Sequence, residues 1–122
     1  MSDDPNPQRE RSSGLTHHLT PEEVWIRQAD AGTYVPEAYD ADGFIHCTDG
    51  ESNLLKVGSQ YYAADRRPYL VLDIALEKLN SAVRYEDPER TYPHIYGPLN
   101  REAVVGVRRA VRLADGTFAA VE

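Results

Sequence analysis

The stretch YLVLDI, Tyr69–Ile74, is the clearest β-strand of the sequence and determines the expected fold. Its residues are almost all apolar or β-forming, which is typical of a strand that lies inside a sheet and is covered on both faces. Six further strand-like segments flank it, at 15–20, 43–48, 82–86, 92–99, 104–113 and 117–121. Their order around two helical segments predicts an α+β domain with a largely antiparallel sheet.

Two helices are expected in the N-terminal half, packed on this sheet. The first begins in the TPEE motif at 20–23, whose first and last residues have the spacing of a capping box, and it ends before Gly32. The second begins in a similar motif, TDGE at 48–51, and ends near Tyr62. Each helix therefore follows an expected strand directly.

The chain has 122 residues, one cysteine and a formal net charge of −7. This length suits a single domain, placed at 15–122, after a polar tail at 1–14 that is expected to be disordered. The acidic charge argues against nonspecific nucleic-acid binding, because phosphate backbones are repelled. No apolar run is long enough to span a membrane, and the N-terminus lacks the apolar region of a signal peptide. The sequence therefore predicts a soluble, cytoplasmic protein with no membrane partner.

Three histidines, His18, His46 and His94, occur in three different expected strands. Since side chains alternate along a strand, each of the three falls on the more polar face of its segment. The same alternation groups His17 with the leucines of its strand and Cys47 with the core, so both are interpreted as structural. The side chains expected on the polar faces beside the three histidines are Thr20, Phe44, Thr48, Tyr92 and Tyr96.

These faces favour a site for a small, nucleotide-like ligand. The free N–H groups of helix N-termini attract phosphate, and aromatic rings stack on a base or on nicotinamide. A histidine on a strand is also commonly structural, and the spacing does not show that the three strands are neighbours. The histidines lie far apart and lack the close His or Cys pairs of zinc sites, so no metal is expected.

Three motifs in order carry a resemblance to a known family: HLT at 18–20, GFIHCT at 43–48 and YPHIYGPL at 92–99, before a Val-rich strand. They resemble the small bacterial family catalogued as domain of unknown function 952, over about 15–113. This resemblance implies a split-sheet fold similar to the ADP-ribosyltransferase superfamily, with kinship to the RNA 2′-phosphotransferases. Those enzymes bind NAD in a cleft between two small sheets.

The resemblance also implies roles for individual residues. His18 matches the position that contacts the NAD ribose, and His46 matches the position beside the nicotinamide. The threonines that follow these motifs, Thr20 and Thr48, are then expected to line the same cleft. His94 and Tyr96 belong to the family's own YPHIYGPL motif.

The sequence departs from the ADP-ribosyltransferases in one respect. Many of them place a glutamate on a late strand, and neither Glu86 nor Glu102 lies in such a motif. The RNA 2′-phosphotransferases work without this glutamate and bind phosphate through arginines, for which Arg84, Arg101 and Arg108 are the candidates here.

We therefore expect an enzyme that binds NAD, as a substrate, or another ADP-ribose-containing ligand, and acts at the ribose by transfer or hydrolysis. His18, His46 and His94 are its expected catalytic residues, since imidazole exchanges protons near neutral pH. One alternative is a non-catalytic module that binds a nucleotide or metabolite. Another is a metal-dependent hydrolase built on the three histidines.

Overall fold

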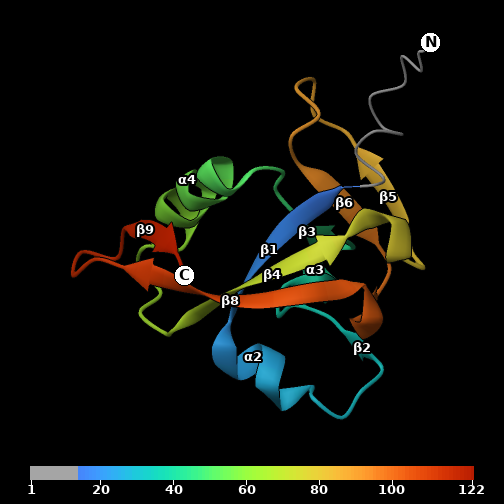
Figure 1. Cartoon of the computed structure of the whole chain (residues 1–122), viewed down its shortest axis with the longest axis horizontal. Coiled ribbons are helices and arrows are strands. Elements are labelled where there is room, and N and C mark those ends of the chain that lie inside the picture. The colour runs from blue at the N-terminus through green and yellow to red at the C-terminus, as the bar shows by residue number, and fades with distance from the viewer. Residues whose placement is uncertain (1–13) are drawn as a thin grey trace.

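The computed structural model describes residues 14–122, so that the expected tail at 1–14 lies, except for Gly14, outside the described residues. A four-stranded antiparallel sheet in the order β1-β4-β8-β9 forms one part of the fold (Figure 1). Its strands are β1 (Leu15–Pro21), β4 (Tyr69–Ala75), β8 (Val104–Arg112) and β9 (Phe118–Val121). The YLVLDI segment is thus an inner strand, as its composition predicts.

A smaller antiparallel sheet, in the order β3-β6-β5, forms the other part. Its strands are β3 (Ile45–His46), β6 (Pro93–Tyr96) and β5 (Ala82–Tyr85), and a separate pair joins β2 (Thr33–Tyr34) to β7 (Leu99–Asn100). One bridge, between His17 of β1 and Thr48 just after β3, connects the two sheets. The α+β class and the predominance of antiparallel strands are confirmed.

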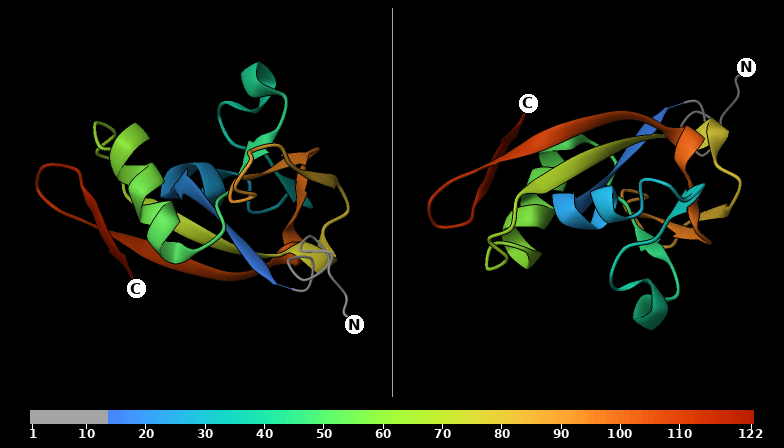
Figure 2. Two further views of the ribbon diagram at one scale, coloured as in Figure 1. Left: turned by 90° about the horizontal axis from the view of Figure 1, so that it is seen from above. Right: turned by 90° about the horizontal axis from the view of Figure 1, so that it is seen from below.

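Within residues 14–122, three short α-helices accompany the strands: α2 (Glu22–Arg27), α3 (Tyr39–Asp42) and α4 (Glu51–Tyr61). Two 3₁₀ turns, η1 (Leu76–Lys78) and η2 (Arg101–Ala103), precede β5 and β8. Helix α4 packs against β1 and β9, whereas α3 projects from the body of the molecule (Figure 2). The two expected helices exist, and the sequence did not predict α3.

Both predicted capping boxes are wrong, because the two threonines expected to cap the helices are paired in β-structure instead. Thr20 pairs with Leu70 inside the sheet, and α2 starts after Pro21 with no side-chain cap. Thr48 exchanges both backbone hydrogen bonds with His17, and α4 starts after Gly50, whose φ of 87° favours glycine. Helix α2 also ends earlier than predicted, at Arg27.

Strand β4 separates two apolar cores, which explains its continuous apolar run. On one face, Leu72 and Ile74 pack with the inward side of the smaller sheet, including Ile45 and Ile95. On the other face the core lies under α4 and consists of Leu19, Leu54, Tyr69, Val71 and Phe118. Both faces of the larger sheet are therefore covered along much of β4.

Candidate functional site

Four rings gather on the outward face of the smaller sheet, and we call Phe44, His46, His94 and Tyr96 the imidazole–aromatic cluster. His46 and His94 are direct partners across β3 and β6, with ring centroids 5.4 Å apart. Phe44 stacks on His94 at 4.0 Å with planes 13° apart, and lies 4.7 Å from His46 and 5.3 Å from Tyr96. Stacking at this separation is a favourable ring geometry.

Strand alternation produces the cluster. Ile45 and Ile95 are paired across β3 and β6 and are fully buried, so the next pair along, His46 and His94, points the opposite way. Along β6 buried and half-buried residues alternate, which leaves Tyr96 on the same face as His94. The sequence predicted that Phe44 and His46 share a face of one strand and that His94 and Tyr96 share a face of another, and the geometry confirms both. That the two strands are neighbours, which the sequence left open, is a finding of the structure.

Two carboxylates orient the imidazoles. His46 donates from Nε2 to Asp42 Oδ2 at 2.9 Å, and His94 donates from Nδ1 to Glu86 Oε1 at 3.0 Å. Tyr96 also donates its hydroxyl proton to Glu86, at 2.5 Å. These bonds from Tyr96 and then His94 lower the pKa of Glu86.

Each imidazole of the cluster keeps one nitrogen without a protein partner among residues 14–122. A carboxylate only accepts hydrogen bonds, so the proton of each neutral ring lies on the nitrogen that faces it. The lone pair is then on Nδ1 of His46 and on Nε2 of His94. The cluster therefore offers two proton acceptors whose tautomers are fixed.

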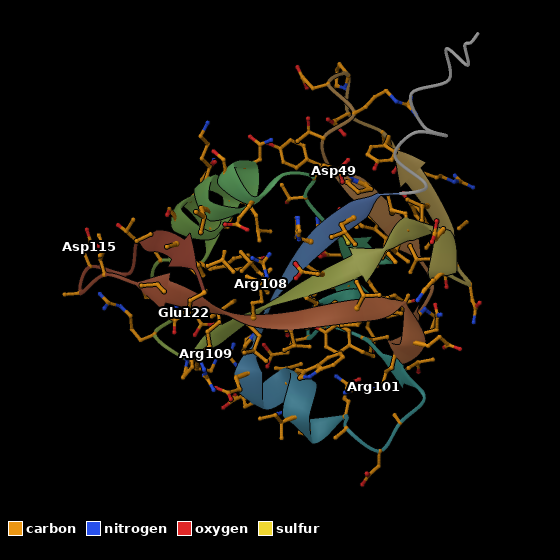
Figure 3. All side chains as sticks on the ribbon, in the orientation of Figure 1. Asp49, Arg101, Arg108, Arg109, Asp115 and Glu122 are labelled. Carbon is orange, nitrogen blue, oxygen red and sulfur yellow. The ribbon has the colours of Figure 1, made fainter. Side chains whose placement is uncertain are left out.

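One of the three candidate arginines lies at the cluster. Arg84, opposite His94 on β5, places its guanidinium 5.1 Å from the ring centroid of Tyr96. Arg101 instead stacks on Trp25 beside α2, at 3.7 Å, and Arg108 extends from β8 (Figure 3). Arg84 is thus the arginine available to a ligand at the cluster.

His18 does not face an open surface: the polar face of β1 that it shares with Thr16 and Thr20 is buried. His18 is 5% exposed, because both faces of β1 are covered. His18 donates from Nδ1 to the carbonyl oxygen of His46 at 2.6 Å, and its Nε2 lies 3.0 Å from the Tyr34 hydroxyl. Burial lowers the pKa of His18 to about 4, so the ring is neutral at pH 7. Its catalytic role stays a prediction.

The remaining predicted residues are spread over the fold. Thr20 and Thr48 are buried, at 1% and 4% exposed, and the Thr20 hydroxyl accepts a bond from Tyr34 at 2.7 Å. Tyr92 precedes β6 and is 39% exposed. The structure therefore unites Phe44, His46, His94 and Tyr96 but leaves these three outside the cluster's ring contacts. Their ligand-binding roles stay predictions.

Sequence reasoning missed the carboxylates of the cluster, Asp42 and Glu86. Glu86 accepts the hydroxyl proton of Tyr96, and the guanidinium of Arg84 lies over the same ring. A signal was present for Glu86. If 82–85 and 93–96 pair as a hairpin, Glu86 lies on the same face of the sheet as His94. For Asp42 the signal was its position four residues before His46.

A metal site built on the three histidines is not assembled, because both ring nitrogens of His18 already have protein partners. Within the part of the chain that the structure describes, no group of three or more His, Cys, Asp or Glu side chains is placed to hold a metal ion. No helix there is long and apolar enough to cross a membrane.

Two surface hollows, of about 460 and 530 Å³, lie beside α2 rather than at the cluster. Both are lined by Glu22 and Ile26, and neither includes a histidine. These two hollows therefore do not contain the imidazole pair. We base the functional site on the imidazoles, since shape alone supplies no chemistry.

The profile of the family described as "Protein of unknown function (DUF952)" matches residues 19–107. The chain belongs to this family. The match confirms the family resemblance seen in the three sequence motifs, and it contains the whole imidazole–aromatic cluster. A search of curated proteins gives no match.

Solved structures of protein CC0527 from Caulobacter crescentus have the same fold as this DUF952 chain. Its crystal structure aligns with a TM-score of 0.72 at 21% identity, over 88% of this chain and 93% of that one. A double mutant of CC0527 gives 0.72 at 20% identity over the same shares. The solution NMR structure gives 0.68 at 20% identity, over 85% and 90%. At these identities the likeness concerns the fold alone.

Proposed function

We propose that this DUF952 protein binds NAD or another ADP-ribose-containing compound at the imidazole–aromatic cluster and acts at its ribose. One observation carries the proposal: two imidazoles with fixed tautomers lie 5.4 Å apart beside the rings of Phe44 and Tyr96. Rings bind a flat heterocycle by stacking, and imidazoles exchange protons at neutral pH. The resemblance to ADP-ribosyltransferase-like proteins supplies the ligand class.

The cluster binds two parts of such a ligand, its flat ring and its phosphates. The nicotinamide or adenine ring stacks on the exposed aromatic surface, with Tyr96 as one wall. Arg84 lies beside the Tyr96 ring and attracts the phosphates of the ligand. This local attraction opposes the repulsion of phosphate by the net charge of −7. Asp42 and Glu86 keep the imidazoles in position.

At the ribose, the proposed step breaks the bond between C1′ and the nicotinamide nitrogen. The electron pair of this bond goes to the ring nitrogen, which becomes neutral as nicotinamide leaves. A water or acceptor hydroxyl forms the new C1′–O bond, and its proton passes to Nε2 of His94. Glu86, bonded to the other nitrogen, stabilises the imidazolium. His94 is thus the proposed general base.

His18 has a supporting role in this proposal. It holds the carbonyl of His46 from beneath, and its depressed pKa of about 4 keeps it neutral at the pH of the reaction. A neutral ring adds no charge that would raise or lower the proton affinity of His46. Its effect on catalysis is therefore expected through the position of His46 and not through contact with the ribose.

Calorimetry with ADP-ribose and an assay of nicotinamide release from NAD test the proposal. We expect saturable ADP-ribose binding that weakens roughly tenfold in His46→Ala, since one stacked, hydrogen-bonding ring is lost. We expect nicotinamide release to slow about 100-fold or more in His94→Ala. Tyr61→Ala, 68% exposed on α4, is the control and keeps both. Absence of ADP-ribose binding to the wild-type chain overturns the proposal.

The solvent exposure of the cluster favours a second candidate, a module that binds the ligand without reaction. The side chain of His46 is 54% exposed, whereas catalytic sites for reactive sugars exclude bulk water. This candidate predicts ADP-ribose and NAD binding of similar strength and no nicotinamide release. Enzymatic turnover by the purified chain eliminates it.

A further inference from the structure

A second set of polar residues crosses the larger sheet in one row. Thr48 pairs with His17, His17 with Asp73, and Asp73 with Gly106, on four neighbouring segments. Residues directly opposite in antiparallel pairs point to the same face, so their side chains are neighbours. A Thr–His–Asp row therefore lies on one face, although the three residues are far apart in sequence.

Gly106 makes room for the carboxylate of this row. A Cβ built on Gly106 lies 2.7 Å from Oδ2 of Asp73, closer than side-chain carbons come to oxygen. Arg108, two residues on, donates from Nε to Oδ2 at 2.8 Å and from Nη2 to Oδ1 at 2.9 Å. Asp73 is 8% exposed, and this bidentate pair compensates its buried charge.

The remaining donor to Asp73 is His17, whose Nδ1 lies 2.7 Å from Oδ1. Since the carboxylate accepts, Nδ1 of the neutral ring carries the proton and Nε2 carries the lone pair. His17 is 9% exposed, and within residues 14–122 its Nε2 has no protein partner and is not among the fully enclosed polar atoms that lack one, so this nitrogen keeps some accessible surface. The hydroxyl of Thr48 likewise has no protein partner within these residues and is not among the fully enclosed polar atoms that lack one.

The neighbouring histidine, His18, differs from His17 in its hydrogen bonds. His18 has partners on both nitrogens and lies in the core, whereas His17 has one nitrogen fixed by a carboxylate and the other open. An imidazole held in this way by an aspartate is the arrangement that general bases use. The sequence interpretation of His17 as structural does not account for its open nitrogen.

The charges around the row define the kind of ligand. Arg108 is bonded to Asp73 and also donates from Nη1 to Glu51 of α4 at 2.9 Å. Two carboxylates thus share one guanidinium, and no positive charge is left for an anion. The groups that remain open, Nε2 of His17 and the Thr48 hydroxyl, suit an uncharged hydroxyl compound or water.

We propose that His17, Asp73 and Thr48 form a second site, in which Nε2 of His17 accepts a hydrogen bond from a ligand hydroxyl held beside Thr48. The ligand class is a small uncharged polyol or sugar. Asp73 holds the ring in the tautomer that leaves Nε2 as the acceptor, and no covalent bond is made or broken. The site does not depend on ligand binding at the imidazole–aromatic cluster.

Chemical modification tests the open nitrogen. Diethyl pyrocarbonate acylates an unprotonated, accessible imidazole, and fragment-ion mass spectrometry distinguishes the adjacent His17 and His18. Both rings are largely buried, and at pH 7 we expect acylation of His17 through its unbonded Nε2 but not of His18, whose two ring nitrogens are bonded. In Asp73→Asn the rate at His17 is expected to fall about tenfold or more, because the amide does not fix the tautomer. An unreactive His17, or equal rates in the two proteins, overturns the proposal.

If Asp73→Asn does not fold, NMR of the wild-type chain tests the proposal instead. Long-range ¹⁵N correlations are expected to show a proton on Nδ1 of His17 and none on Nε2. Titration with D-ribose is expected to shift the His17 ring resonances saturably, and Thr48→Val, of similar shape, is expected to lose this shift. A proton on Nε2, or no shift with ribose, contradicts the proposal. His17→Gln is expected to leave ADP-ribose affinity unchanged, which separates this site from the proposed function.

Discussion

Acidification should destabilise this protein through one buried side chain, His18. In the unfolded chain its ring binds a proton near pH 6.5, and in the folded chain burial lowers the pKa to about 4. Between these two values the unfolded state binds more protons, so the free energy of unfolding falls as the pH falls. The stabilising effect is complete above pH 6.5 and is lost toward pH 4.

The size of this effect follows from the shift in pKa. At 1.36 kcal/mol per unit, the difference between 6.5 and about 4 corresponds to about 3 kcal/mol between pH 7 and pH 4. The energy reflects the cost of charging a ring that is 5% exposed and faces the hydroxyl of Tyr34. About 3 kcal/mol is a large part of the stability of a small domain.

Urea unfolding of the wild-type chain and of His18→Gln, at pH 7, 5.5 and 4, measures the effect. The variant is expected to be less stable at pH 7 and to lose about 3 kcal/mol less on acidification. Leu54→Ala, a core variant that keeps every histidine, is the control and should retain the wild-type pH dependence. Equal losses in the wild-type chain and His18→Gln, or an NMR titration of His18 near pH 6.5, refute the reasoning.

Three further predictions concern packing and burial. Gly58→Ala places a Cβ 2.6 Å from the ring of Phe118 and should lower the free energy of unfolding by about 1–2 kcal/mol. Gly32→Ala, whose Cβ meets nothing within 4 Å, is the control and should not lower it. Urea unfolding of the two variants measures the difference. Cys47 is buried and burial raises its thiol pKa, so a thiol reagent should react with it only after denaturation, and fast labelling of the native chain contradicts this. Tyr34→Phe removes a hydroxyl bonded inside the core and should cost about 1–3 kcal/mol in thermal unfolding, and no change speaks against those bonds.

The residue pattern within single strands correctly predicted two local features of the fold. The apolar run of β4 indicated burial on both faces, and two cores are found there. Alternation along β6 correctly placed His94 and Tyr96 on one face. On β1 it did not show that the polar face of His18 and Thr20 is covered by distant parts of the chain.

Contacts that depend on strand register were missed. The contact between His94 and Glu86 depends on the register of β5 against β6, for which a hairpin pairing was an available signal. The contact between His17 and Asp73 depends on the register of β1 against β4, which joins distant parts of the sequence. One clue was available: Asp73 interrupts an otherwise apolar strand, and a buried carboxylate needs a charged or hydrogen-bonding partner. The ring stacking of Phe44 had no comparable signal.

Histidine side-chain NMR during titration with ADP-ribose tests ligand binding at the imidazole–aromatic cluster most directly. The account predicts saturable shifts of the His46 and His94 ring resonances, reduced in Arg84→Gln because the guanidinium beside Tyr96 is lost. Unchanged His46 and His94 resonances at saturating ADP-ribose, or shifts confined to other residues, would contradict it.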